Sequence, residues 1–198
     1  MSGNATTSLP MLTLASAPPE AHAILERAKH QIGMVPNMYG FMAQVPGLLE
    51  TYLFGYERFR QESGLTPAEQ EVVFLAISRE NECDYCMAAH SFLADTQSGL
   101  ATAVTDAIRD DRTIQDTQLA ALAAFARTMV RTRGRPTPQD LEALLGEGYT
   151  DRHVFAIILA IGVKTFSNYS NHFAATPLDT FFKGREWTPP QAGAEVGV

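Results

Sequence analysis

The sequence of 198 residues predicts an all-α fold of about seven to nine helices. Apolar residues recur at helical spacing through most of the chain, and prolines, glycines and capping residues divide them into separate segments. No run alternates apolar and polar residues with period two over the length of a strand. Apolar residues make up 45% of the chain and charged residues 19%, so one domain of this length can bury an ordinary globular core.

The first half of the chain carries start signals for five helices. The strongest signal is formed by Thr66, Pro67 and Glu69, which supply a capping hydroxyl, a proline at the first helical position and a capping-box carboxylate. Gly33 and Gly64 are expected to end the helices that precede them. The predicted helices cover residues 19–31 and 38–43 and then begin at residues 46, 67 and 82, with Asn37 and Asn81 as caps.

The second half contains four further predicted helices, at residues 100–108, 116–132, 138–145 and 151–167. Thr150 is expected to cap the last of them. This last helix and residues 72–77 of the first half are apolar on nearly every face, so both are predicted to be central. Residues 168–172 and 176–179 are predicted to lead out of the last helix into a tail. The predicted organisation is an N-terminal tail (1–18), one all-helical domain (19–185) and a C-terminal tail (186–198).

The sequence also contains a degenerate internal repeat of a helix pair. Residues 65–77 and 86–90 resemble residues 149–161 and 168–172. Two antiparallel helix pairs related by a pseudo-twofold axis would give this pattern. The second copy has lost both cysteines but ends, like the first, on a histidine, His172.

Charge and hydropathy exclude several classes of partner. The formal net charge is −7, and no basic run or aromatic–basic alternation offsets it, so we expect no nucleic-acid partner. Residues 1–17 contain no lysine or arginine, and Pro10 interrupts their apolar stretch, which argues against a signal peptide. No apolar run reaches the length of about 18 residues that a membrane span requires. We therefore expect a cytoplasmic protein that does not bind membranes.

Residues 81–90 hold both cysteines of the chain and one of its five histidines. On a helix, Cys83, Cys86 and His90 fall within an arc of about 60°, so two thiols and an imidazole share one face. With Asn81 as the N-cap and Asp84 as the capping-box acid, both cysteines would lie in the first turn and a half. The positive end of the helix dipole favours a thiolate there, and the thiolate is the reactive form of cysteine.

The spacing of these residues leaves two other interpretations open. The cysteines could be buried structural residues beside a core histidine. Alternatively, Cys83, Cys86 and His90 could bind zinc, with Glu71 as a fourth ligand. A structural zinc site usually takes its ligands from two separated pairs, and the chain has no second CxxC and no HxxxH. We therefore expect neither a metal nor another cofactor.

The chain resembles a known family in this region. Glu71, followed after eleven residues by Cys83-Asp84-Tyr85-Cys86 and then by His90, is similar to the signature of the alkylhydroperoxidase D-like (AhpD-like) branch of the carboxymuconolactone decarboxylase superfamily. The likeness is most specific over residues 65–95. The segments that resemble the peroxidase-related subgroup are residues 34–37, the Asn81-x-Cys83 lead-in and residues 168–179.

The resemblance implies an AhpD-like helical fold that completes its core as a homo-oligomer, either a dimer, a trimer or a hexamer. It also implies that the protein reduces an organic hydroperoxide and receives electrons from a thiol or dithiol reductant. In the scheme of the family, Cys86 corresponds to the peroxidatic cysteine and Cys83 to the resolving one. Glu71 and His90 correspond to the glutamate and histidine that relay protons.

Tyr85 departs from the family pattern, because the best-studied members have a histidine between the two cysteines. A relay from Glu71 to the thiols would then pass through water or through the tyrosine hydroxyl. The internal repeat could bring His172 close to the dithiol, although a hydrogen-bonded core or interface histidine accounts for it equally well. We therefore regard Tyr85 and His172 as possible additional site residues.

Two functions other than a peroxidase are compatible with the sequence. The dithiol could be the switch of a redox-responsive binding protein that turns over no substrate. The family also contains cysteine-free decarboxylases that act on a lactone acid, so the chain could be an acid–base enzyme with incidental cysteines.

Overall fold

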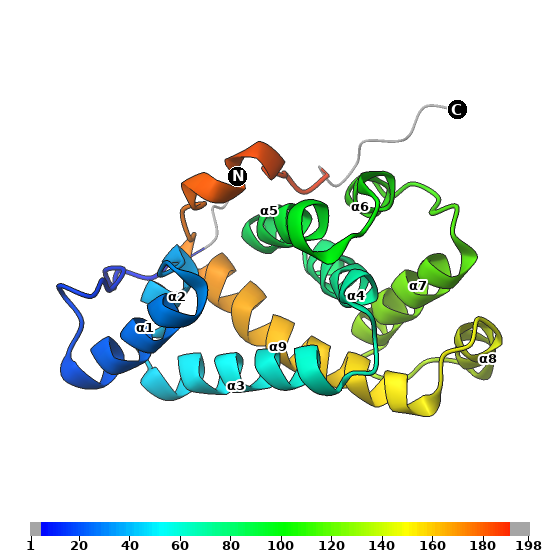
Figure 1. The fold of residues 1–198 in the computed structure, drawn as a ribbon, viewed down its shortest axis with the longest axis horizontal. Coiled ribbons are helices and arrows are strands. Elements are labelled where there is room, and N and C mark those ends of the chain that lie inside the picture. The colour runs from blue at the N-terminus through cyan, green and yellow to red at the C-terminus, as the bar shows by residue number, and fades with distance from the viewer. Residues whose placement is uncertain (1–4, 191–198) are drawn as a thin grey trace.

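The structure is a computed structural model and describes residues 5–190. Every regular element in this range is helical, as predicted (Figure 1). The α-helices are α1 (Pro19–Ile32), α2 (Asn37–Met42), α3 (Pro46–Glu62), α4 (Pro67–Glu80), α5 (Asp84–Leu93), α6 (Thr102–Arg109), α7 (Thr117–Arg131), α8 (Pro138–Gly146) and α9 (Asp151–Ala174). A π-helical turn (Ala94–Ser98) follows α5, and the 3₁₀ segment η2 (Thr180–Arg185) follows α9. None of the described helices combines the length and hydropathy of a bilayer span.

The helix α4 is central, as its apolar sequence predicts. Its residues from Gln70 to Ser78 are all buried, and it packs against α5, α6, α7 and α9. Figure 1 shows α5 and α6 on one side of α4 and α9 on the other side. Side chains from α4, α5 and α9 therefore meet in the interior of the bundle.

Most helix ends agree with the local signals in the sequence. The Thr66 hydroxyl accepts a hydrogen bond from the Glu69 N–H (3.3 Å), and the Glu69 carboxylate accepts one from the Thr66 N–H (2.7 Å). Gly33 ends α1 and Gly64 follows α3, with φ angles of 80° and 76°. Glycine adopts these left-handed conformations without the steric cost that a side chain would add. Asp116 caps α7 by accepting a hydrogen bond from the Leu119 N–H (2.9 Å).

The helix α9 is longer than predicted, because it continues past Ser167 to Ala174. Asparagine and serine are poor helix formers, and their frequency from residue 168 onward led us to end the helix too early. Tertiary contacts override this propensity. The Asn168 and Asn171 side chains are buried, and Asn168 Oδ1 accepts a hydrogen bond from the Asn81 amide (2.9 Å).

The predicted start of α5 was wrong. Asn81 is the C-cap of α4, Glu82 has a left-handed φ of 55°, and Cys83 occupies the N-cap position of α5. Asp84 is the first helical residue and forms no capping box. The Asn81 amide is instead used in the contact with α9 described above. Cys83 therefore precedes the first turn of α5, and Cys86 lies within that turn.

The two copies of the internal repeat start alike and continue differently. Thr66 caps α4 with Glu69, and the Thr150 N–H before α9 donates to His153 Nδ1 (2.9 Å). The Tyr149 hydroxyl donates to Glu69 Oε1 (2.9 Å), so the two helix starts are adjacent. The second copy then runs through residues 168–172 as one continuous helix, where the first copy turns from α4 into α5.

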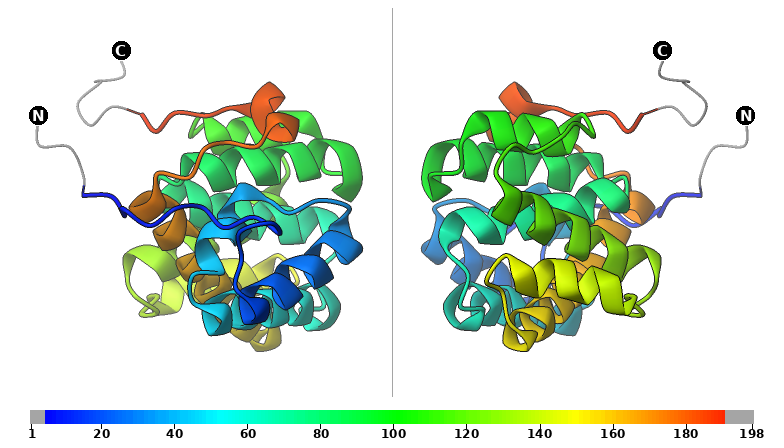
Figure 2. Two further views of the ribbon diagram at one scale, coloured as in Figure 1. Left: turned by 90° about the vertical axis from the view of Figure 1, so that its left-hand side faces the viewer. Right: turned by 90° about the vertical axis from the view of Figure 1, so that its right-hand side faces the viewer.

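The chain before α1 lies against the helical bundle. The Leu12 N–H donates to the Gly40 carbonyl (3.1 Å), and the Thr7 N–H donates to the Phe173 carbonyl (2.9 Å). Figure 2 shows this segment, in blue, running past α2 towards the end of α9.

The chain after α9 folds back over α5, as the red segment in Figure 2 shows. Asp179 accepts a hydrogen bond from the N–H of Asn37 (3.2 Å), which is the first residue of α2 and not its cap, as we had predicted. Trp187, in the segment that we assigned to the C-terminal tail, is only 9% exposed, and its indole N–H donates to the Arg109 carbonyl (3.2 Å). Residues 1–4 and 191–198 of the two predicted tails lie outside the described residues.

The close approach of the N-terminal segment to α2 can be tested at Gly40. A Cβ atom at this position would lie 2.5 Å from the Leu12 carbonyl oxygen and 2.6 Å from the Met11 side chain. We expect Gly40→Ala to lower the free energy of unfolding by about 1–3 kcal/mol in a urea titration. Gly47→Ala is the control, because a Cβ there meets nothing within 4 Å. Equal stability of the two variants would contradict this contact.

Candidate active site

The four residues of the sequence signature lie together in the interior of the bundle. Glu71 on α4, His90 and Cys86 on α5, and Cys83 at the start of α5 are each 4% exposed or less. His90 Nδ1 lies 2.8 Å from Glu71 Oε2. The Asn171 amide nitrogen on α9 lies 3.3 Å from Cys86 Sγ and 3.8 Å from Cys83 Sγ. No disulfide joins the two cysteines in this structure.

The two thiols differ in acidity. Burial raises the pKa of Cys83 well above its ordinary value, and the neighbouring Cys86 adds to this shift. Burial acts in the same direction at Cys86, but the hydrogen bond from Cys83 and the positive charge of Lys164 outweigh it. These interactions hold the pKa of Cys86 well below its ordinary value. The pair therefore consists of a Cys86 thiolate and a Cys83 thiol that donates to it.

Glu71 is an ionised carboxylate whose two oxygens are both engaged. Oε1 accepts a hydrogen bond from the Arg60 guanidinium, and Oε2 is the partner of His90. Burial raises the pKa of Glu71, but His90 and Arg60 outweigh this effect and hold the pKa below its ordinary value. An ionised carboxylate only accepts hydrogen bonds, so His90 donates from Nδ1 and leaves the lone pair of Nε2 available. Burial and the charge of Lys164 lower the pKa of His90, so the imidazole is neutral near pH 7.

The sequence analysis missed three polar residues around this cluster: Arg60 on α3, and Lys164 and Ser167 on α9. One signal for Lys164 was present, because it is the sole charged residue between His153 and His172, in a helix that is otherwise largely apolar. Nothing in the sequence marked Ser167, which lies at the end that we predicted for α9. The internal repeat was a signal for Asn171, because it placed the segment that ends on His172 near the dithiol, and the Asn171 amide lies beside both sulfurs.

Neither of the two additional candidates contacts the thiols. The Tyr85 hydroxyl donates to the Asp179 carboxylate, and burial together with this hydrogen bond raises the pKa of Tyr85. Its proton is therefore held by the segment after α9. His172 is exposed, because successive residues on a helix point about 100° apart and Asn171 takes the inward position.

A hollow of about 720 Å³ opens beside the start of α5. Its lining includes Asn81, Glu82 and Asp84 on one side and Asn171 and His172 on the other. Asn171 is also the residue whose amide contacts both sulfurs. Asn171 therefore lies between this hollow and the two sulfurs.

The zinc interpretation finds no support in the geometry. In the part of the chain that the structure describes, no three His, Cys, Asp or Glu side chains are grouped as metal ligands. His90 Nδ1 and both oxygens of Glu71 are used in the hydrogen bonds described above.

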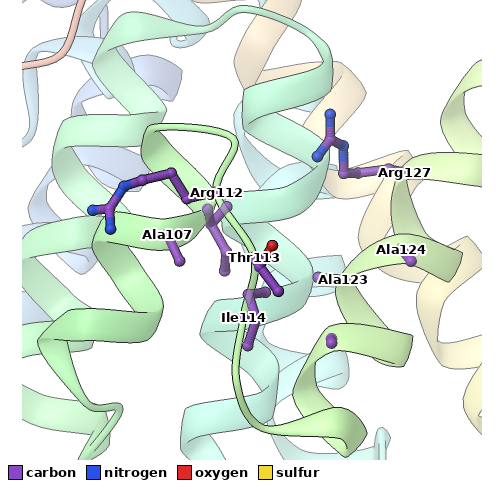
Figure 3. A pocket seen from close by; sticks show the side chains of 9 residues that line it. Ala107, Arg112, Thr113, Ile114, Ala123, Ala124 and Arg127 are labelled. Carbon is purple, nitrogen blue, oxygen red and sulfur yellow. The ribbon is translucent and has the colours of Figure 1, made fainter. Parts of the chain in front are cut away.

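A second hollow, of about 220 Å³, lies between α6, α7 and the chain that joins them (Figure 3). Ala107, Ile114 and Ala123 contribute to its lining, and Arg112 and Arg127 also border it. Arg127 already forms ion pairs with Glu80 and Asp111. The lining of this hollow contains no cysteine, histidine or carboxylate, and neither cysteine of the dithiol is part of it.

Comparison with known proteins agrees with this site. The sequence model of the carboxymuconolactone decarboxylase family matches residues 46–128, which include Glu71, both cysteines and His90. Over these residues the chain is similar to this family. The matched segment contains all of α3, α4, α5 and α6. It therefore supplies the dithiol together with Glu71 and His90. The contacts from α9 come from outside it. No curated protein matches the chain significantly.

Solved structures share the fold of this chain. An uncharacterized peroxidase-related protein with an alkylhydroperoxidase AhpD core, from Ralstonia eutropha JMP134, is 23% identical with a TM-score of 0.77 over 91% of this chain and 97% of its own. An uncharacterized peroxidase-related protein from Silicibacter sp. TM1040 is 24% identical with a TM-score of 0.72, over 91% of this chain and 95% of its own. The debrominase Bmp8 is 16% identical with a TM-score of 0.74, over 91% of this chain and 96% of its own. The predicted AhpD-like fold is thereby confirmed.

The different acidities of the two thiols predict one thiolate per chain at neutral pH. We expect the absorbance at 240 nm to show a thiolate inflection well below pH 8.5, the ordinary value for a free thiol. Cys86→Ser is expected to remove this inflection. Cys83→Ala should keep it but move it to higher pH, because the thiol that donates to Cys86 is lost. Two inflections at ordinary values in the wild-type protein would contradict the assignment.

Proposed function

We propose that the protein is a thiol-dependent peroxidase that reduces an organic hydroperoxide with the Cys83–Cys86 dithiol. One observation carries this proposal: the two thiols are buried together, with both sulfurs within 3.8 Å of the same Asn171 amide nitrogen. A nucleophilic thiolate with a resolving thiol beside it is the arrangement that two-cysteine reduction of a peroxide requires.

The reaction takes place in two steps. The Cys86 thiolate attacks one peroxide oxygen, so an S–O bond forms while the O–O bond breaks, and the alkoxide takes a proton from water to leave as an alcohol. The Cys83 sulfur then attacks the sulfenic acid at Cys86, and a disulfide forms as water leaves. Two thiols are oxidised and the hydroperoxide is reduced to an alcohol and water. A thiol or dithiol reductant returns the two electrons by disulfide exchange.

His90 is the proton carrier in this scheme, and Glu71 positions it. Neutral His90 takes up the proton that Cys83 releases during its attack, through the lone pair of Nε2, and passes it to the hydroxyl group that leaves Cys86 as water. The Glu71 carboxylate holds the ring by Nδ1 and stabilises the imidazolium that forms. The sequence had led us to expect Glu71 as the general base, but both of its oxygens are already engaged by Arg60 and His90.

The hollow at the start of α5 is the proposed route to the dithiol. Both sulfurs are almost completely buried, so a small hydroperoxide must pass the Asn171 side chain to reach Cys86. The reductant approaches the oxidised pair from the same side. Because the cycle needs a supply of thiols, we propose that the protein acts in the cytoplasm, where thiols are kept reduced.

The peroxidase proposal is tested by turnover of cumene hydroperoxide with dithiothreitol as the reductant. We expect Cys86→Ser to abolish turnover. His90→Gln should lower kcat/KM by about 10²-fold or more, the usual contribution of one acid–base group. His30→Gln, at an exposed position on α1, is the matched control and should have no effect.

The variants also separate the alternatives. A dithiol that is oxidised once by the peroxide and is not regenerated by any thiol would indicate a redox switch. Full activity of Cys86→Ser would contradict the peroxidase and favour an acid–base enzyme of the decarboxylase type that uses Glu71 and His90.

We also propose that the chain forms a homo-oligomer through the exposed apolar face of α3 and α9. Phe155 (72% exposed), Tyr169 (62%) and Phe173 (59%) lie along α9, and Phe54 (64%) lies on α3. A hollow of about 560 Å³ between these two helices is bordered by an Arg58–Glu62 pair (3.0 Å). A face of this kind, apolar and without net charge, is complementary to a second copy of itself.

Light scattering on a size-exclusion column tests this association. The wild-type chain is expected to have the mass of a dimer or a larger oligomer, and Phe155→Glu is expected to lower it. Phe181→Glu is the control, because Phe181 is similarly exposed (65%) but lies on η2, away from this face. A monomeric wild-type protein would contradict the proposal.

A further inference from the structure

Lys164 is a buried cation that neither the sequence signature nor the proposed reaction uses. Its side chain is on α9, the residue is 1% exposed, and Nζ has no hydrogen-bond partner among the described residues. The other two lysines of the chain, Lys29 and Lys183, are exposed. A lysine is almost never fully buried without a counter-charge, because its desolvation is costly. An anion is therefore expected close to Nζ.

The position of Lys164 on α9 indicates which group this anion is. Residues 164, 167 and 171 are spaced by three and four residues and so form one stripe along the helix. Ser167 Oγ lies 3.8 Å from Cys86 Sγ, and Asn171 Nδ2 lies 3.3 Å from it. Two members of the stripe thus contact the Cys86 sulfur, and Lys164 is the third.

Aromatic packing places the ammonium on the same side of α4 as His90. Nζ lies 5.5 Å from the centroid of the Phe74 ring, and this ring is 4.8 Å from the imidazole of His90. The positive charge is therefore enclosed between α4, α5 and α9, away from solvent. Its field lowers the pKa of both Cys86 and His90, in accordance with this placement.

The other ionisable groups around Lys164 do not supply the anion. Glu71 on α4 already has Arg60 and His90 as partners. Burial raises the pKa of the remaining groups, which therefore stay protonated at neutral pH: Tyr39 on α2, Tyr52 and Tyr56 on α3, and Cys83 and Tyr85 at the start of α5. Cys86 is the group that remains.

We infer that Lys164 is a positioning residue whose buried ammonium is the counter-charge of the Cys86 thiolate. The inference rests on the proposed function, because it concerns the same dithiol. It adds a cation on α9 to a mechanism that the sequence had confined to α4 and α5. It also adds a source of thiolate stabilisation other than the start of α5.

The inference has a consequence for the redox equilibrium. Oxidation by the hydroperoxide converts a thiolate and a thiol into a neutral disulfide, with the loss of two electrons and one proton. Lys164 then has no anion beside it. Its charge therefore favours the reduced dithiol over the disulfide, and it makes the oxidised pair easier for a thiol to reduce.

The test compares Lys164→Met, which removes the charge at similar volume, with Lys164→Arg, which keeps it. Lys29→Met is the control at an exposed lysine. We expect Lys164→Met to decrease the Cys86 thiolate fraction at pH 7 at least tenfold, measured by absorbance at 240 nm, while Lys164→Arg and Lys29→Met retain it. In a glutathione redox buffer, the same tenfold change would make the reduction potential about 30 mV more negative. A folded Lys164→Met protein with wild-type titration and potential would overturn the inference.

A second measurement applies if Lys164→Met fails to fold. In the chain that keeps Lys164, Cys86→Ser removes the anion and leaves a buried charge unpaired, whereas Cys83→Ser does not. We expect Cys86→Ser to lower the midpoint of thermal unfolding more than Cys83→Ser does. Equal midpoints would overturn the inference.

These measurements do not depend on turnover, so the two proposals can fail separately. A thiolate that depends on Lys164 in a protein without hydroperoxide turnover would contradict the peroxidase and leave the role of Lys164 intact. Turnover of hydroperoxide with a thiolate that does not depend on Lys164 would contradict this role alone.

Discussion

The buried contact between the start of α5 and the last turns of α9 is the constraint on which this site depends. A thiol pair surrounded by apolar side chains would be neutral and unreactive, because burial disfavours the thiolate. Here α9 places an amide and a hydroxyl against the Cys86 sulfur, from Asn171 and Ser167, and Lys164 lies on the same stripe of the helix. The same contact keeps α9 helical through residues of low helix propensity. The length of α9 and the acidity of Cys86 therefore have a common origin.

The interior balances its charges in two groups. Glu71 is neutralised by Arg60, Cys86 by Lys164, and neutral His90 lies beside both groups. Removing one partner of a buried pair typically costs about 3–5 kcal/mol, because the other charge is left desolvated. An exposed pair such as Arg58–Glu62 contributes only about 0–1 kcal/mol. The buried charges therefore do more to fix the protonation states of the dithiol and of His90 than the surface charges could.

Tyr85, which occupies the position of a histidine in the family signature, contacts the segment that follows α9. Tyr85 points to Asp179, which also accepts the N–H at the start of α2, so the residue between the cysteines ties α5 to α2 through the chain after α9. In this protein the tyrosine hydroxyl is used in this contact, and the proposed proton relay consists of Glu71 on α4 and His90 on α5.

The sequence by itself determined the fold class, the family signature and most helix ends, because these depend on local signals: helical spacing of apolar residues, capping boxes, prolines and left-handed glycines. It also singled out Cys83, Cys86 and His90, because they share one short segment, and Glu71, through the resemblance to the family signature. The tertiary structure alone decided that Asn81 caps α4 and not α5, that α9 extends to Ala174, and that the Ser167 hydroxyl lies beside the Cys86 sulfur. These features result from contacts between residues 81 and 87 positions apart, Cys86 with Ser167 and Asn81 with Asn168, and local propensity does not encode such contacts.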